Sequence, residues 1–328
     1  MSMDKAPRWT RRGLAGAGAA LALAGGARAQ GSYPERPVTF IVPFGAGGAG
    51  DTVGRVLAEK LAERLGKPVI IETRAGGNGI IGSEMVARAR PDGHTLLLAT
   101  SATHAVNPAI RTTLPYNPLA DFAPVALIGR FPFMICVNPR LGARTLAEFV
   151  ALAKARADKL NYGYWTPTSI VASEIFSRIT GISMVGVSYR SSPAALADLV
   201  AGRIDVMFVD VLTGRPFVQS GEILALAATT ATRTQVLADL ATVQELGIGN
   251  YDMSSWLGLF APGATPAPIL AQVSTAVVEV LRSPAVAARL LELGFDVQAM
   301  PREQFIDYSR NELAVWRDLV QRAGIRPE

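Results

Sequence analysis

Residues 38–52 of this 328-residue chain read VTFIVPFGAGGAGDT. The β-branched and aromatic side chains at positions 38–42 favour a strand, and the glycines that follow favour a tight loop. Beyond the loop, five apolar residues recur at the spacing of one helix face: Val53, Val56, Leu57, Leu61 and Leu65. The stretch therefore predicts a strand, a glycine loop and a helix in succession.

The glycine loop is a candidate anion site. Glycine lets the backbone turn with its N–H groups exposed, and the start of the helix adds unpaired donors and a partial positive charge. Asp51, near the start of the predicted helix, is interpreted as its N-cap residue. A loop that packs well and binds nothing is the alternative.

The same glycines also match a dinucleotide-binding motif. Gly45, Gly47 and Gly50 give G-x-G-x-x-G after a strand, and Glu72 ends the next strand where such folds place an acid that binds ribose. Against this hypothesis, Asp51 would place a carboxylate where a pyrophosphate must lie, and Pro43 interrupts the end of the strand. An exported nicotinamide-dependent oxidoreductase stays open as an alternative function.

Residues 1–29 predict a signal peptide. Basic residues precede an Ala/Leu/Gly run that is short for a membrane span, and Ala27-Arg28-Ala29 is an A-x-A cleavage site before Gln30. Arg11-Arg12 fits a twin-arginine signal, although ordinary secretory signals also contain such pairs. We expect a mature protein that begins at or near Gln30, resides in the periplasm and is not embedded in the membrane.

The charge and cysteine content argue against several classes of partner. The chain has 32 Lys+Arg and 27 Asp+Glu, but residues 1–29 hold five of the bases and one acid, so the mature part is nearly neutral. Neutrality gives no reason to expect nucleic acid binding. Cys136 lies in an apolar run that predicts a buried strand, and His94 and His104 are too few for a metal site. We expect no metal and no cofactor.

Strand-like and helix-like segments alternate through two parts of the chain. Strands are predicted at residues 69–71, 95–99, 160–164, 184–189, 204–210 and 224–228, and helices at 80–89, after Thr145, from the loop 165–169 to Gly181, and from Ser191 to Gly202. We expect two segments to cross between the parts, residues 125–137 and residues 255–263. The first of these is interpreted as two strand pieces. We expect an α/β fold with mixed or parallel sheets and helices on both faces: domain 1 from residues 30–130 and 254–328, domain 2 from residues 131–253.

A series of motifs follows in order along the mature chain: YPERP at 33–37, IVPFGAGG at 41–48, ETRAGGNGIIG at 72–82, PDGHTLL at 91–97, LPYNP at 114–118, DFAPV at 121–125, YR at 189–190, DVMF at 205–208 and WLGLFAP at 256–262. This series resembles the Bug-type solute receptors of tripartite tricarboxylate transporters. The resemblance implies a periplasmic binding protein of the type II-like, two-domain Venus flytrap kind, without catalysis. It also implies a small carboxylate solute held between the domains and a monomer that delivers it to membrane permease subunits. A sensory module for a membrane kinase would use the same cleft.

The chain departs from the family at two places. Where the family has a glycine/serine-rich loop and a helix that begins near a histidine, this chain has WTPTS at 165–169 followed by Ile170. The family's Tyr-Lys/Arg-Gly is Tyr189-Arg190-Ser191 here, which keeps the aromatic and the cation but loses a flexible glycine.

Candidate ligand contacts lie in the loops that follow predicted strands, because the carboxyl ends of parallel strands meet at one edge. Backbone N–H groups and hydroxyls would bind a carboxylate. Tyr164 and Trp165 would either form walls or pack the hinge, and Arg190 would either bind a distal carboxylate or be an ordinary surface arginine. Asp210 would either bind a ligand ammonium or hydroxyl, or cap the next helix. The candidates are Phe44, Ala46, Gly47, Gly48, Asp51, Thr100, Ser101, His104, Tyr164, Trp165, Thr166, Thr168, Ser169, Tyr189, Arg190 and Asp210.

Overall fold

The computed structural model describes residues 33–156 and 158–327. The predicted signal peptide and its cleavage site lie outside these residues. The chain from Arg36 onward forms a compact unit of its own, and the description that follows concerns that unit.

Three parallel strands form the first strand group, in the order β2–β1–β3. They are β1 (Val38–Val42), β2 (Val69–Thr73) and β3 (Thr95–Thr100). The quoted stretch folds as its sequence predicts, because β1 leads through the glycine loop into helix α2 (Ala49–Leu65). The helix packs its Gly54 against Leu98 and Val42, while helix α3 (Ile80–Ala87) lies on the side of Ile41 and Leu97.

Two long antiparallel strands continue the sheet, β9 (Ser254–Pro262) beside β3 and then β4 (Phe122–Val137). The prediction of two strand pieces at residues 125–137 is wrong, because β4 is one strand. Its neighbour changes along its length: Pro132 is the last residue paired with β9, and Phe133 is the first paired with β7. Pro132, which lacks an N–H, therefore lies at the point where the partner of β4 changes from β9 to β7, and β4 continues through it.

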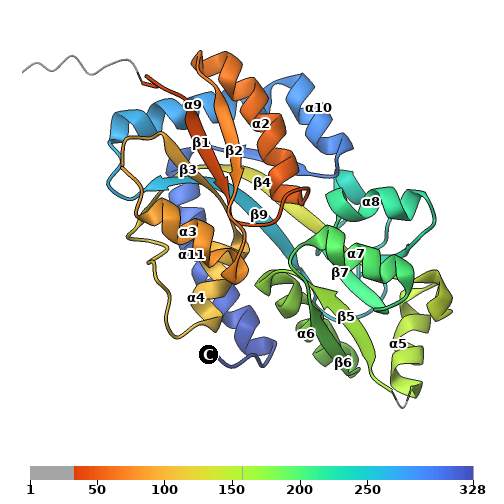
Figure 1. Ribbon diagram of the computed structural model, residues 1–328. Helices are drawn as coiled ribbons and strands as arrows, with labels where there is room; N and C mark the ends of the chain where they lie inside the picture. The colour runs from red at the N-terminus through yellow and green to blue at the C-terminus, as the bar shows by residue number, and fades with distance from the viewer. Residues whose placement is uncertain (1–32, 157, 328) are drawn as a thin grey trace, which may run out of the picture. The chain divides into compact units, whose positions relative to one another are not determined.

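The second strand group joins the far part of β4 in the order β4–β7–β5–β6, with β8 also on β4. Its strands are β5 (Leu160–Tyr164), β6 (Met184–Ser188), β7 (Val206–Asp210) and β8 (Leu224–Ala228). Strands β5, β6 and β7 are parallel to one another, whereas β7 and β8 are antiparallel to β4. The expected mixed sheet is confirmed (Figure 1).

Helices cover both faces of the second strand group. They are α5 (Leu146–Ala155), α6 (Pro167–Thr180), α7 (Ser192–Ala201) and α8 (Val211–Gln219). Val206 and Phe208 of β7 pack in the core that contains α5 and α6, whereas Met207 and Val209 pack in the core that contains α7. This alternation is the two-residue period of a strand that is buried on both faces. Cys136 is buried in the second of these cores, as predicted.

The last part of the chain returns to the first strand group and β4. It consists of α9 (Ala267–Arg282), α10 (Pro284–Glu292), β10 (Asp296–Met300), which pairs with β4, and α11 (Arg302–Arg322). Phe305 of α11 packs with Trp256 and Phe260 of β9. Within the described residues no single helix is long and apolar enough to cross a membrane, and only the bent pair α9 and α10 reaches that length and composition together.

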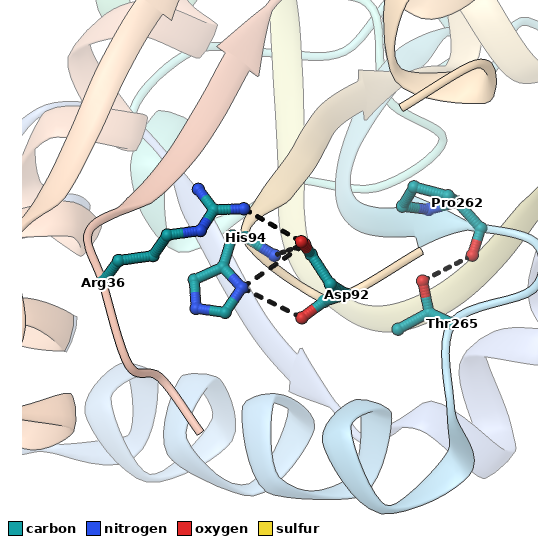
Figure 2. A network of polar contacts seen from close by, with 5 residues as sticks. All are labelled: Arg36, Asp92, His94, Pro262 and Thr265. Carbon is teal, nitrogen blue, oxygen red and sulfur yellow. Dashed lines mark hydrogen bonds and ion pairs between the residues drawn. The ribbon is translucent and has the colours of Figure 1, made fainter. Parts of the chain in front are cut away.

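The motif PDGH at residues 91–94 holds the amino ends of β1 and β3 together (Figure 2). The Asp92 carboxylate accepts hydrogen bonds from the Arg36 guanidinium at 2.9 Å and from the His94 backbone N–H at 3.0 Å. The His94 carbonyl in turn accepts the Thr39 N–H at 2.8 Å. Nearby, Thr265 donates to the Pro262 carbonyl at the end of β9 at 2.7 Å. This motif is structural, because it lies at the strand ends opposite the glycine loop.

Candidate ligand-binding site

A pocket lies where the carboxyl ends of both strand groups meet. We call it the inner pocket; it contains about 550 Å³ of empty space, including its mouth. Residues at the carboxyl ends of β1, β3, β5, β6 and β7, or just after them, form its walls, and β4 and β9 contribute Phe131, Phe133 and Ser255. Its lining consists of Phe44, Gly45, Gly48, Ala49, Gly50, Asp51, Thr100, Ala102, Phe131, Phe133, Trp165, Thr166, Ser191, Ser192, Asp210 and Ser255.

Four α-helices begin at the inner pocket. Their N-cap residues are Gly48 of α2, Thr166 of α6, Ser191 of α7 and Asp210 of α8, and all four line the pocket. The first turn of a helix presents unpaired N–H groups and a partial positive charge. Among the described residues, the lining contains neither lysine nor arginine. Any attraction for an anion in this pocket therefore comes from backbone dipoles and hydroxyl groups.

Two of the four helix starts are occupied by their own side chains. The Thr166 hydroxyl accepts the Ser169 N–H in a capping box at α6. At α8, the Asp210 carboxylate accepts the Thr213 N–H at 2.9 Å and the Thr213 hydroxyl at 2.7 Å. Asp210 is thus the helix cap, one of its two predicted roles. Burial raises the pKa of its carboxyl, and the hydrogen bonds from Thr213 oppose that shift.

The other two helix starts, those of α2 and α7, have no side-chain cap. In α2, the first-turn N–H groups of Ala49 and Gly50 have no carbonyl within the helix to bind. In α7, Pro193 has no N–H, which leaves Ser192 and Ala194 as the first-turn donors. These two starts belong to different strand groups, and they offer donors to one space.

The loops that precede α2 and α7 touch each other. A side-chain carbon placed on Gly45 would lie 3.2 Å from the Ser191 Cβ and 3.7 Å from the Arg190 carbonyl oxygen. A carbon placed on Gly48 would lie 4.0 Å from the Ser192 hydroxyl. Gly45 thus allows a close approach of two backbones that a larger residue would separate. The two strand groups therefore close over the inner pocket on this side.

Asp51 is not the N-cap residue that its type predicts. Gly48 adopts the extended N-cap conformation, with φ −76° and ψ 171°, so the helix begins at Ala49 and Asp51 is its third residue. From there its carboxylate accepts the Gly47 N–H at 2.9 Å and forms an ion pair with Arg55 at 2.9 Å. The expectation that the glycine loop leaves its N–H groups bare is therefore wrong at Gly47, because a carboxylate of the chain already binds there.

Hydroxyl groups line the pocket beside β3 and β9. Ser101 bonds Ser255 at 2.7 Å and Thr168 of α6 at 3.1 Å, which links the two strand groups through buried side chains. The Thr100 hydroxyl is buried, lines the pocket, and has no hydrogen-bond partner among the described residues. Buried hydroxyls normally have partners, so Thr100 is a candidate donor to a ligand.

Residues 101–104 are helical rather than the loop that their sequence predicts, and Thr100 is the last residue of β3. A π-helix covers Ala102–Val106 and continues into α4 (Asn107–Ile110). Thr103 stabilises its start, because its hydroxyl accepts the Thr100 N–H and donates to the Thr100 carbonyl. The turn buries His104 against Phe122 and Phe260, with ring centroids 4.6 and 4.3 Å away. Burial lowers the pKa of His104 to about 3, so it packs in the core as a neutral ring and lines neither pocket.

A second pocket adjoins the first; we call it the outer pocket. Phe44 and Trp165 line both pockets, and the outer pocket contains about 880 Å³ of empty space with its mouth. Tyr189 and Arg190 line only the outer pocket, and the Tyr189 hydroxyl donates to Asp198 at 2.8 Å. The remainder of its wall is formed by Pro43, Ala75, Gly76, Gly77, Asn78 and Gly79.

The structure brings most of the candidate residues to the two pockets. The inner pocket receives Phe44, Gly48, Asp51, Thr100, Trp165, Thr166 and Asp210, and the outer pocket receives Phe44, Trp165, Tyr189 and Arg190. Lining neither pocket are Ala46, Gly47, Ser101, His104, Tyr164, Thr168 and Ser169. Of these, Tyr164 packs against Tyr162, and Ala46 and Gly47 are exposed.

Sequence reasoning missed Ser191, Ser192, Phe131, Phe133 and Ser255 as pocket residues. The motif Ser191-Ser192-Pro193 was recognisable as the start of a helix after a strand, which is the same signal that selected the glycine loop. Ser255 and the two phenylalanines carry no local signal, because they reach the pocket only through the pairing of β4 with β9.

A mixed α/β sheet with helices on both faces and a pocket at the strand ends is the architecture of a periplasmic binding protein. The structure matches R. palustris Rpa4515, solved with adipate, with a TM-score of 0.87 at 32% identity over 90% of this chain and 100% of that chain. It also matches MatC from Rhodopseudomonas palustris, solved with bound malate, with a TM-score of 0.82 at 32% identity over 88% of this chain and 100% of that chain.

The sequence comparisons give the family. Residues 53–325 match the model of the tripartite tricarboxylate transporter family receptor, TctC. BugT of Bordetella pertussis is 31% identical over 298 residues, which are 90% of this chain and 91% of that protein. The chain belongs to this family of receptors, as the series of motifs in its sequence predicts.

Proposed function

We propose that this protein is a solute-binding receptor whose inner pocket captures a carboxylate between the uncapped starts of α2 and α7. The observation that carries the proposal is the pairing of these two helix starts from different strand groups over one pocket without cationic side chains. The carboxylates found in related structures, adipate and malate, agree in chemical class.

The energetics fit reversible capture. A helix start contributes about 0.3–1 kcal/mol to a nearby anion, and up to about 2 kcal/mol in a partly buried geometry. A hydrogen bond to a charged group adds about 1.5–3 kcal/mol. Several such donors, among them the Thr100 hydroxyl, would together bind a carboxylate without a buried ion pair.

Closure of the two strand groups is part of the same proposal. We infer that residues 30–130 with 254–328, and residues 131–253, act as two domains that hinge on β4 and β9, the strands that run between them. A ligand held by both α2 and α7 would bind the closed form better than the open form, which shifts the population toward closure. The closed receptor would then deliver its solute to the permease subunits of a tripartite transporter.

We further propose that the mature protein begins near Gln30, acts in the periplasm and carries out no reaction. Both acids of the inner pocket are engaged in the fold, Asp51 with Gly47 and Arg55, and Asp210 with Thr213. Thr213 does not line the inner pocket, so the Asp210–Thr213 pair caps α8 and does not present a base and a nucleophile to a ligand.

The direct test is Gly48→Val. The φ of Gly48, −76°, is one that valine also adopts, but its Cβ would lie 3.3 Å from the Gly45 carbonyl oxygen, so the loop must shift by a few tenths of an ångström. The side chain enters the space between Gly45 and Ser192. We expect the affinity for a carboxylate such as adipate or malate to fall at least tenfold, about 1.4 kcal/mol, while the fold persists. Isothermal titration measures the affinity, and circular dichroism checks the fold.

Ala151→Val is the matched control, because it adds a valine at an exposed position of α5 away from both pockets. It should bind like the wild type. Unchanged affinity in Gly48→Val would show that the ligand does not use the start of α2. Failure of the wild type to bind any of a panel of mono-, di- and tricarboxylates would refute the proposed function itself.

A further inference from the structure

The inner pocket has one face of the sheet as its floor, at the point where β4 changes its partner strand. Phe131 and Phe133 both line the pocket, and they lie two residues apart on β4, so their side chains share a face. Phe131 pairs with Ser255 of β9, and Phe133 pairs with Asp210 of β7. Paired residues of antiparallel strands lie on the same face, and Ser255 and Asp210 also line the pocket. The floor is therefore a continuous patch of the sheet with two aromatic rings, which we call the floor rings, Phe131 and Phe133.

Neighbouring aromatic side chains hold the floor rings in place. Phe131 packs against the fully buried Phe295, with ring centroids 4.8 Å apart and ring planes at 59°. Phe133 lies edge-to-face with Trp165, with ring centroids 6.4 Å apart and ring planes at 62°. Both floor rings are buried, and Trp165 also lines the pocket. A ligand in the inner pocket therefore meets two fixed rings below it and a third at its side.

The inner pocket offers donors for one anionic group and no charge for the remainder of a ligand. The uncapped starts of α2 and α7 line the same pocket as the floor rings. Among the described residues the lining has no cationic side chain, and its two acids are bound by the chain itself, Asp51 by Gly47 and Arg55 and Asp210 by Thr213. The body of a ligand that is held by its carboxylate at the helix starts is therefore best accommodated when it is uncharged and apolar.

An aromatic ring suits this floor better than an aliphatic chain does, for two reasons. The face of an aromatic ring carries negative partial charge and its edge carries positive partial charge, so rings attract one another in edge-to-face and offset arrangements beyond the effect of buried area. A planar ring also has no internal rotations to lose on binding, whereas a flexible chain loses conformational entropy.

On this basis, and resting on the proposed capture of a carboxylate between the starts of α2 and α7, we propose that the solute is an aromatic carboxylate of the benzoate type and that the floor rings select it. The carboxylate binds the helix starts, the ring of the solute lies on Phe131 and Phe133, and Trp165 forms the side wall. The floor rings then determine specificity through the body of the solute and not through its charge. This class of solute differs from the aliphatic acids adipate and malate of the related structures.

The experiment compares matched ligands. Isothermal titration of the purified mature protein uses benzoate and cyclohexanecarboxylate, which have the same charge and rings of similar size, but only benzoate has a π system. The wild type should bind benzoate at least about fivefold tighter than cyclohexanecarboxylate. In Phe133→Leu and in Phe131→Leu this preference should shrink to less than about twofold, because benzoate binding weakens while cyclohexanecarboxylate binding changes little. Adipate and malate should bind the wild type more weakly than benzoate does.

Phe217→Leu is the control, because it makes the same change at a half-buried ring of α8 that lines neither pocket. It should keep the full preference for benzoate. Urea unfolding checks that each variant is folded. Trp165→Leu, at a half-buried position of the wall, is a second test that does not alter the buried floor, and it should also reduce the preference.

The possible outcomes separate this inference from the proposed function. Equal binding of benzoate and cyclohexanecarboxylate to the wild type, or tighter binding of adipate or malate than of benzoate, would overturn the aromatic class and leave carboxylate capture standing. An equal loss for both ring ligands in Phe131→Leu and Phe133→Leu would overturn the selection by the floor rings. If the wild type binds no carboxylate at all, the proposed function fails, and this inference fails with it.

Discussion

Helices α2 and α7 begin at the inner pocket without a side-chain cap, whereas α6 and α8 begin there with caps from Thr166 and Asp210. All four carry the same backbone dipole toward the same space. The side chain at the N-cap decides whether the first-turn donors are already used or remain available. The comparison teaches that the number of helix starts around a pocket overstates its capacity for an anion, because a side-chain cap uses a first-turn donor that an uncapped start leaves available.

The largest effect should come from giving α2 the kind of cap that α8 has. In Gly48→Asp the new carboxylate would take the first-turn donors and repel a ligand anion, so the affinity for a carboxylate should fall at least a hundredfold, about 2.7 kcal/mol. Stability should change little, because aspartate is a somewhat better N-cap than glycine, whereas its Cβ would lie 3.3 Å from the Gly45 carbonyl oxygen. Isothermal titration and urea unfolding measure the two quantities.

Gly48→Asn is the control for Gly48→Asp, since it adds a side chain of the same shape without the charge. It should lose affinity, but less than the aspartate variant. Wild-type affinity in Gly48→Asp would break the comparison, because it would show that the start of α2 does not hold the ligand.

A second prediction asks whether a charged histidine, rather than backbone dipoles, attracts the ligand. The pKa of His104 is about 3 in the fold and about 6.5 in the unfolded chain, so only the unfolded chain binds this proton between those values. Stability is therefore complete above pH 6.5 and falls with decreasing pH by about 1.4 kcal/mol per unit from this group. Ligand affinity between pH 8 and 5.5 should not follow this titration.

Urea unfolding of the wild type and of His104→Asn across pH 7 to 4 measures this contribution. The variant should be less stable at neutral pH but should lose less stability on acidification. Equal slopes in the two proteins would show that His104 is not held neutral. A rise in the wild-type ligand affinity as the pH falls through 6.5, absent in the variant, would show that a charged histidine takes part in binding.

The smallest effect should come from removing a cap that already satisfies its helix. Thr166→Ala should lower the free energy of unfolding by about 1 kcal/mol, because the Ser169 N–H loses its acceptor. Carboxylate affinity should change by less than threefold, since α6 does not hold the ligand in our proposal. A tenfold loss of affinity with little loss of stability would instead make the start of α6 part of the binding site.

Local sequence rules predicted the elements well. The strand, glycine loop and helix at the start of the mature chain, the capping box of Thr145 and Glu148 at α5, and the buried strand around Cys136 are all present. Each depends on residues within about one helical turn or one strand, where side-chain periodicity and capping act directly. The prediction failed for residues 101–104, where packing of His104 among distant aromatic rings favours a helical turn.

The sequence alone determined that glycine-rich and hydroxyl-rich segments follow strands, and hence that donors gather at the carboxyl ends of a sheet. Only the tertiary structure decided which donors share a space. It placed Ser191 of α7 against Gly45 and left Thr168 bonded to Ser101 instead of facing a ligand. The physical reason is the sequence separation of the residues that interact. A helix cap depends on residues within about four positions of each other. The pocket depends on the pairing of β4 with β9, which lie more than a hundred residues apart in the chain and bring the two strand groups together.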